Sequence, residues 1–208
     1  MTTWNLVLET LPLVAILRGL RPDEAVEIGE TLVAAGFLCL EVPLNSPSPL
    51  DSIRRLREAL GDRAIVGAGT VLTPRAVDEV VAAGGQIVIS PNTNAAVIAA
   101  TKAAGLISFP AFFTPSEAFA AIEAGADALK LFPAETAGPA TLKAMKAVLP
   151  PTTPIFPVGG VDPGNLAAWR AAGADGFGLG SALFKPGRSA AEVKAAADAF
   201  VAAWRAAV

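Results

Sequence analysis

Short apolar runs recur along the chain at roughly regular intervals, and polar segments separate them. Each run is continuous rather than alternating, which is typical of strands that are buried on both faces of a parallel sheet. We therefore predict eight strands, within residues 13–19, 38–44, 64–71, 86–91, 106–112, 128–134, 155–161 and 176–183.

The polar segments carry start and stop signals of helices. Thr73, Thr114 and Asp162 each precede a proline and are candidate N-caps, and Pro22 stands near a further helix start. Residues 114–117 and 189–192 have the spacing of capping boxes. Glycines stand where helices should end, at positions 36, 61, 84, 105, 125 and 173.

Eight strand–helix units without a linker or a change in composition predict one domain over residues 1–208, an α/β fold of the (β/α)₈ TIM barrel type. Residues 1–10 are expected to add a short helix that covers the bottom of the barrel. An open, doubly wound sheet is the alternative fold.

Composition narrows the class of protein. Of the 208 residues, 53% are hydrophobic and 17% are charged, so self-association that covers apolar surface is plausible. The net charge of -3 and the lack of a basic run argue against a nucleic-acid surface. The chain opens without a basic segment and has no apolar run of roughly 18 residues, so we expect no signal peptide, no membrane span and a cytoplasmic location.

The residue inventory excludes several kinds of chemistry. The sequence contains no histidine and no tyrosine, which rules out a Ser-His triad and a histidine-liganded zinc site. The one cysteine, Cys39, lies in an apolar run and is interpreted as a small buried side chain in a reducing compartment. Chemistry must therefore depend on Lys, Glu, Asp, Arg, Ser and Thr.

Three charged residues fall inside the expected strands: Arg18, Glu41 and Lys130. All three lie toward the carboxyl ends of their strands, the end at which barrels place their active sites. An internal ion network without a function is the structural alternative. The other lysines, at positions 102, 143, 146, 185 and 194, fall on expected helices or loops and are interpreted as solvated.

A lysine that is desolvated near Arg18 should have a lowered pKa and supply a neutral amine, which attacks carbonyl carbons. Glu41 across the mouth of the barrel could then transfer the protons.

Glycine-rich turns follow the last two expected strands. Gly159, Gly160, Gly180 and Ser181 offer backbone N–H groups where barrels often bind phosphate at the N-terminus of a short helix. The stretch "GAGTV" lacks the third glycine of a dinucleotide fingerprint, so Thr70 is better interpreted as a hydroxyl at the mouth.

Seven stretches carry a resemblance along nearly the whole chain: "AILRG", "EVPLNSP", "GAGTVL", "ISPN", "EAGADALKLFP", "VGGV" and "GLGSAL". In order and spacing they resemble the Schiff-base aldolases of 2-keto-3-deoxy-6-phospho sugar acids. The resemblance implies that Lys130 forms the imine and that Glu41 is the general acid/base. It also implies that the substrate and its phosphate are bound by Arg18, Thr70, Pro91, Val158, Gly159, Gly160, Gly180 and Ser181.

Within that family, Asn45 in "EVPLNSP" and Val158 in "PVGG" resemble the members for 6-phosphogalactonate-type substrates rather than the C4-epimeric 6-phosphogluconate type. Because position 45 lacks the family's arginine, Thr70 and Arg18 are expected to hold the substrate carboxylate. Ala111 follows Pro110 where the family usually has Pro-Gly, which leaves the local shape of the pocket open.

The resemblance implies a lyase that cleaves a 2-dehydro-3-deoxy-6-phospho sugar acid to pyruvate and D-glyceraldehyde 3-phosphate, with no metal or other cofactor, as a homotrimer. The alternatives are the gluconate-type epimer as substrate, a phosphate-binding isomerase or epimerase with Glu41 as proton shuttle, and a module that binds phosphosugar acids without turnover.

Overall fold

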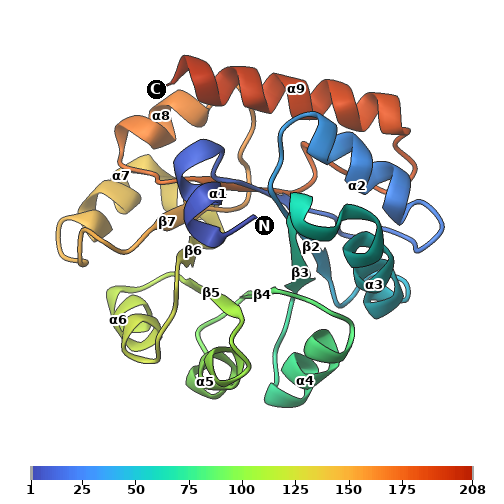
Figure 1. Cartoon of the computed structure of the whole chain (residues 1–208). Helices are drawn as coiled ribbons and strands as arrows, with labels where there is room; N and C mark the ends of the chain where they lie inside the picture. Colours follow the sequence, from blue (N-terminus) through green and yellow to red (C-terminus); the bar gives the residue numbers. More distant parts are fainter. Residues whose placement is uncertain (1, 208) are drawn as a thin grey trace.

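The structure, a computed structural model, describes residues 2–207, and these form a ring of strands surrounded by helices (Figure 1). The strands are β1 (Leu13–Ile16), β2 (Cys39–Pro43), β3 (Ile65–Gly69), β4 (Ile87–Ser90), β5 (Ile107–Phe112), β6 (Leu129–Leu131), β7 (Ile155–Pro157) and β8 (Phe177–Leu179).

All strand pairs are parallel, and the order in the sheet is β7-β6-β5-β4-β3-β2-β1-β8. A bridge links Val158, directly after β7, to Gly178 within β8. Each strand thus lies beside its neighbour in sequence, and the sheet nearly closes on itself. The TIM-barrel prediction is confirmed, and the alternative of an open, doubly wound sheet is wrong.

The helices are α1 (Trp4–Thr10), α2 (Ala25–Ala34), α3 (Pro49–Leu60), α4 (Pro74–Ala82), α5 (Ala95–Ala103), α6 (Pro115–Glu123), α7 (Ala134–Lys146), α8 (Leu166–Ala171) and α9 (Ala190–Ala206), with a 3-10 turn η1 (Gly61–Arg63). Apart from α1, the α-helices form an outer ring around the strands (Figure 1). Within the described residues, no helix has both the length and the apolar character needed to cross a membrane.

The helix signals in the sequence are largely confirmed. Thr73 and Thr114 cap α4 and α6, and both expected capping boxes are formed, at the starts of α6 and α9. Pro22 stands near the start of α2, which begins at Ala25. Asp162 is not the N-cap of α8 as expected: it accepts from the backbone N–H groups of Gly164 and Asn165 in a turn before that helix.

The expected helix at the bottom of the barrel is α1, which lies over the middle of the ring in Figure 1. The Trp4 ring packs on those of Phe109 and Phe156, with centroids 6.0 and 5.9 Å away. The same interior cluster contains Cys39, whose thiol pKa is raised by burial. Cys39 is therefore an inert packing residue, as expected.

The strands end earlier than the apolar runs predict. β1 ends at Ile16, so Arg18 lies in the following turn. The expectation that Arg18 lies within the strand is therefore wrong. Leu17 and Leu20 in this loop are fully buried. Because buried apolar side chains continue past the last strand residue, hydrophobicity does not mark where the strand ends.

Candidate active site

Lys130 and Glu41 both point into the barrel from its walls. Leu129 and Leu131 pack in the core between sheet and helices, and Lys130 between them faces the interior with 6% of its surface exposed. Glu41 lies in the same way between Leu40 and Val42 and is 1% exposed. The alternation of side chains along β2 and β6 therefore brings two ionisable groups into one apolar interior.

The environment shifts the pKa of each group toward neutrality. Burial raises the pKa of the Glu41 carboxyl to about 7, although the positive charges of Lys130 and Arg18 oppose this shift. Burial also lowers the pKa of the Lys130 ammonium, which nearby Arg18 lowers further and Glu41 raises. The Nζ atom of Lys130 lies 4.7 Å from the centre of the Phe132 ring. The pair therefore combines a more readily deprotonated amine with a carboxyl that can gain and lose a proton near pH 7.

Gly69 makes room for the Glu41 carboxyl. A Cβ atom on Gly69 would overlap Oε2 and Cδ of Glu41 and would lie 2.5 Å from Oε1. Among the described residues, Glu41 Oε2 is buried and has no hydrogen-bond partner. The carboxyl is thus held by packing against the glycine backbone, with one oxygen free to accept a proton from a bound molecule. Sequence reasoning missed this role of Gly69, for which a glycine inside a strand was the only signal.

Arg18 is joined to the loop after β2. Its NH1 group donates to Oδ1 of Asn45 at 2.6 Å, and the next backbone N–H, of Gly19, donates to the Ser46 hydroxyl at 2.9 Å. Asn45 thus orients the guanidinium of Arg18 instead of supplying a charge of its own.

A pocket of about 140 Å³ opens at the carboxyl ends of the strands next to Lys130. Seven of the residues expected at the site line it: Arg18, Lys130, Val158, Gly159, Gly160, Gly180 and Ser181. Glu41 does not line this pocket, but its charge interacts with that of Lys130, which does. Thr70 and Pro91 follow β3 and β4 at the same end of the barrel, but they do not belong to the lining of this pocket.

Thr70 has a strained backbone, with φ at 58°, in the left-handed region that a β-branched residue rarely adopts. Such a conformation costs about 1–3 kcal/mol and is concentrated at functional sites. The strain directly follows Gly69, so the turn after β3 is fixed in an unfavourable conformation beside the Glu41 carboxyl.

The glycine pair after β7 has a packing role that sequence reasoning missed. Gly159 and Gly160 have φ values of 105° and 66°, and a Cβ atom on Gly160 would lie 2.7 Å from Cβ of Glu135. A Cβ atom on Gly159 would overlap Oε2 of the same glutamate. The first turn of α7 therefore packs against this loop and brings a carboxylate to it.

The chain after β8 forms a single turn at residues 181–183, in which the carbonyl of Gly180 accepts from the N–H groups of Leu183 and Phe184. The next helix, α9, begins only at Ala190.

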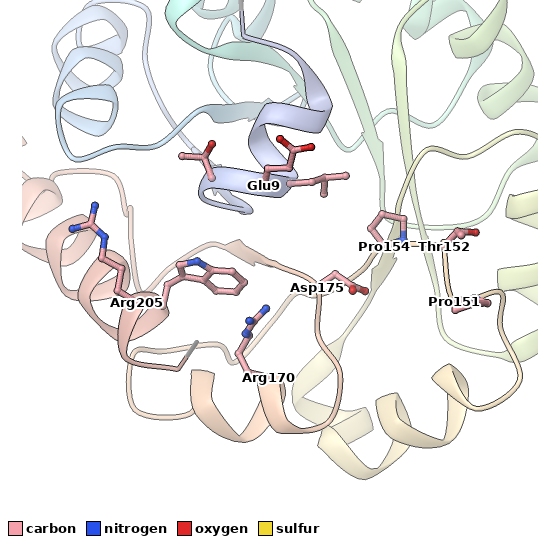
Figure 2. Close-up of a pocket in the computed structure, with 10 residues that line it drawn as sticks. Glu9, Pro151, Thr152, Pro154, Arg170, Asp175 and Arg205 are labelled. Atoms are coloured by element: carbon pink, nitrogen blue, oxygen red, sulfur yellow. The ribbon is translucent and has the colours of Figure 1, made fainter.

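A separate cavity of about 630 Å³ lies at the opposite end of the barrel, and Figure 2 shows the residues that line it. It lies before β7 and β8 and beside α1, α8 and α9. Two of its charged residues serve the fold: Arg170 stacks on Trp204 at 4.0 Å, and Asp175 accepts from Lys146 and from the Ile155 backbone. Since the strands present their amino ends here, the cavity is remote from Lys130.

The sequence profile of the KDPG and KHG aldolase family matches residues 5–196. A curated protein, the 2-dehydro-3-deoxy-6-phosphogalactonate aldolase of Escherichia coli (strain K12), is 48% identical over 95% of this chain and 97% of the relative. A solved structure described as native KDPGal has a TM-score of 0.94 at 47% identity, over 95% of this chain and 96% of the other.

A further solved structure is a cube-shaped, highly porous protein cage designed by fusing symmetric oligomeric domains. The match covers 95% of this chain and 73% of the cage chain, with a TM-score of 0.94 and 47% identity. The family model covers most of the sequence and the E. coli relative is similar along nearly its whole length, so the chain belongs to the KDPG and KHG aldolase family.

Proposed function

We propose that this aldolase cleaves 2-dehydro-3-deoxy-6-phosphogalactonate to pyruvate and D-glyceraldehyde 3-phosphate, with Lys130 as the imine-forming residue and Glu41 as the general acid/base. The observation that carries the proposal is the buried pair at the mouth of the barrel. Burial lowers the pKa of Lys130, and Glu41 beside it has a pKa of about 7.

The reaction begins when neutral Lys130 Nζ adds to the C2 carbonyl of the substrate. Protonated Glu41 gives a proton to the hydroxyl of the carbinolamine, which leaves as water, and the resulting protonated imine acts as an electron sink. Ionised Glu41, directly or through water, accepts the proton of the C4 hydroxyl as the C3–C4 bond breaks. The bond electrons move into the imine to form an enamine, and the C4 hydroxyl becomes the aldehyde of the leaving triose phosphate.

The same proton completes the cycle. C3 of the enamine takes a proton, with Glu41 as the donor, and hydrolysis of the resulting imine releases pyruvate and restores the amine. The Oε2 atom of Glu41, which is unpaired among the described residues, fits this role because no competing hydrogen bond must break.

We assign the remaining site residues to binding. Arg18, oriented by Asn45, supplies the positive charge for the substrate carboxylate, and Thr70 and Pro91 border the reacting end. The phosphate lies at the far end, where Gly159, Gly160, Gly180 and Ser181 line the pocket.

The galactonate configuration at C4 is supported by Val158 as well as by the similarity to the E. coli relative. Val158 is 5% exposed and lines the Lys130 pocket, and Gly178 leaves space for it, since a Cβ atom there would lie 2.6 Å from Cγ2 of Val158. An apolar side chain at this point does not bond to a C4 hydroxyl, so the hydroxyl must point elsewhere for both ends of the substrate to bind.

We further propose that the protein acts in the cytoplasm as a homotrimer. Several large apolar side chains are exposed on the isolated chain: Leu72, Val81, Phe113, Phe119 and Val148. Association would remove part of this surface from water, and the similarity to a cage designed by fusing symmetric oligomeric domains supports a symmetric assembly.

The direct test measures turnover of the two C4-epimeric 6-phospho acids from the rate at which pyruvate is released. We expect a higher kcat/KM for the galactonate epimer, and a preference shifted toward the gluconate epimer in Val158→Thr. Conversion of the substrate without pyruvate release that survives in folded Lys130→Met would favour an isomerase or epimerase, and phosphate-ester binding without any product would favour a binding module.

A further inference from the structure

A second pocket, of about 430 Å³, adjoins the Lys130 pocket. The two share Ile16, Arg18, Gly180 and Ser181, so they form one continuous depression at the mouth of the barrel. The second pocket adds residues from the loops after β1, β2 and β8: Gly19, Asn45, Phe184, Lys185 and Pro186.

Gly180 stands on the border between the two pockets and has no packing reason to be a glycine. A Cβ atom on Gly180 would have no neighbour within 4 Å, and its φ lies outside the left-handed region. Nearby Gly178, in contrast, is required by the close approach of Val158. The missing side chain at Gly180 therefore leaves open space between the pockets, as expected where a ligand passes close to the backbone.

Lys185 is held at the rim of the second pocket by its neighbours. Phe184, the residue before it, is 2% exposed. Pro186, the residue after it, packs closely on Gly19: a Cβ atom on Gly19 would lie 2.5 Å from the proline ring. Arg188 also donates to the carbonyls of Ala182 and Leu183, at 2.8 and 2.9 Å. The backbone that carries Lys185 is therefore fixed, although the side chain itself is exposed.

Within residues 2–207, Lys185 forms no ion pair. The other parts of the proposed phosphate end provide little positive charge. Gly159 and Gly160 lie against the Glu135 carboxylate, which repels a dianion, and Arg18, oriented by Asn45, is assigned to the substrate carboxylate. A phosphate bound near Gly180 and Ser181 would be farther from Glu135 and closer to the free cation of Lys185.

We propose that Lys185 recognises the phosphate group of the substrate, and that the phosphate extends past Gly180 and Ser181 into the second pocket. The inference rests on the proposed function and deepens it, since it identifies the residue that selects phosphorylated over unphosphorylated acids. An ammonium group is a compact point charge that suits a phosphate at a solvent-facing rim.

The first test compares kcat/KM for 2-dehydro-3-deoxy-6-phosphogalactonate with that for the same acid without its phosphate. We expect Lys185→Met to lower this ratio at least about tenfold, since a bond between charged groups contributes about 1.5 kcal/mol or more. Lys185→Arg should keep most of the preference because it retains the charge. Lys143→Met, on the exposed face of α7, is the matched control and should keep the wild-type ratio.

The second test measures binding of inorganic phosphate by calorimetry and does not depend on turnover. Weaker binding to Lys185→Met than to wild type and Lys143→Met supports the proposal, even if the wild type fails to cleave the phosphorylated acid and the proposed function is wrong. Equal phosphate affinity in Lys185→Met and wild type, or an unchanged kcat/KM ratio, would overturn the role of Lys185 and leave the aldolase reaction standing.

Discussion

Adding one methyl group at Gly69 should displace the Glu41 carboxyl without touching Lys130. In Gly69→Ala, the new Cβ would overlap Oε2 and Cδ of Glu41 and lie 2.5 Å from Oε1, whereas ordinary contacts begin at 3.4 Å. The carboxyl must therefore move by about 1 Å, a displacement that can cost about 100-fold in rate when it affects a catalytic group. The φ of Gly69 is outside the left-handed region, so alanine adds no strain of that kind.

The assay separates proton transfer from imine formation. We expect kcat for cleavage to fall about 100-fold in Gly69→Ala. Lys130 should still be trapped by pyruvate and borohydride, because the substitution leaves the amine in place. Exchange of the pyruvate methyl protons with solvent deuterium should slow in parallel with cleavage, since both need a proton carrier at C3 or C4.

A double-mutant cycle provides the control. Glu41→Asp shortens the acid by one methylene and leaves room for the methyl group, so Gly69→Ala combined with Glu41→Asp should lose less activity than the product of the two single losses. A Gly69→Ala protein with the wild-type fold and a kcat within twofold of wild type would refute the reasoning. Strictly multiplicative losses would refute the steric link between Gly69 and Glu41.

Three further predictions concern stability. Burial raises the pKa of Glu41 from 4.5 to about 7, so the folded state resists its ionisation. In urea unfolding, the free energy of unfolding of wild type should therefore fall by on the order of 3 kcal/mol relative to Glu41→Gln between pH 5 and pH 8. A difference that stays constant with pH would contradict this. Trp4→Ala should lower the free energy of unfolding by about 2 kcal/mol through the lost contacts with Phe109 and Phe156, while kcat stays unchanged because the active site lies at the other end of the barrel. Leu6→Ala, at an exposed site, is the control, and an equal effect of both would argue against the packing role of α1. Thr114→Ala removes the N-cap of α6 and should cost about 1 kcal/mol, and full retention of stability in the same urea assay would show that the cap contributes nothing.

The barrel could be predicted from the sequence because its evidence is local. Continuous apolar runs and capping residues recur in each unit, so the number and type of elements follow from short windows. The strand ends could not be predicted, since the loops at the mouth are buried as well. The position of Arg18 beyond β1 shows the consequence: hydrophobicity continues through Leu17 and Leu20 after the strand pairing stops.

The paired charges of the site were also visible in the sequence, because Glu41 and Lys130 interrupt apolar strands. The roles of Gly69 and Glu135, and the one proposed for Lys185, were not, because each depends on how distant parts of the chain are arranged in space. Gly69 meets a side chain of another strand, and Glu135 meets the loop after β7. Lys185 is as solvent-exposed as the sequence suggested, and only the shape of the pocket beside it distinguishes it from the other lysines.

The central claim is that Lys130 forms a covalent imine, and reductive trapping tests it most directly. Wild type, Lys130→Met and Lys143→Met would be incubated with pyruvate and borohydride, and their intact masses and peptide maps compared. The account predicts one pyruvate adduct on Lys130 in wild type and Lys143→Met, and none in Lys130→Met. A folded wild-type protein without an adduct, or an adduct at another lysine, would contradict it.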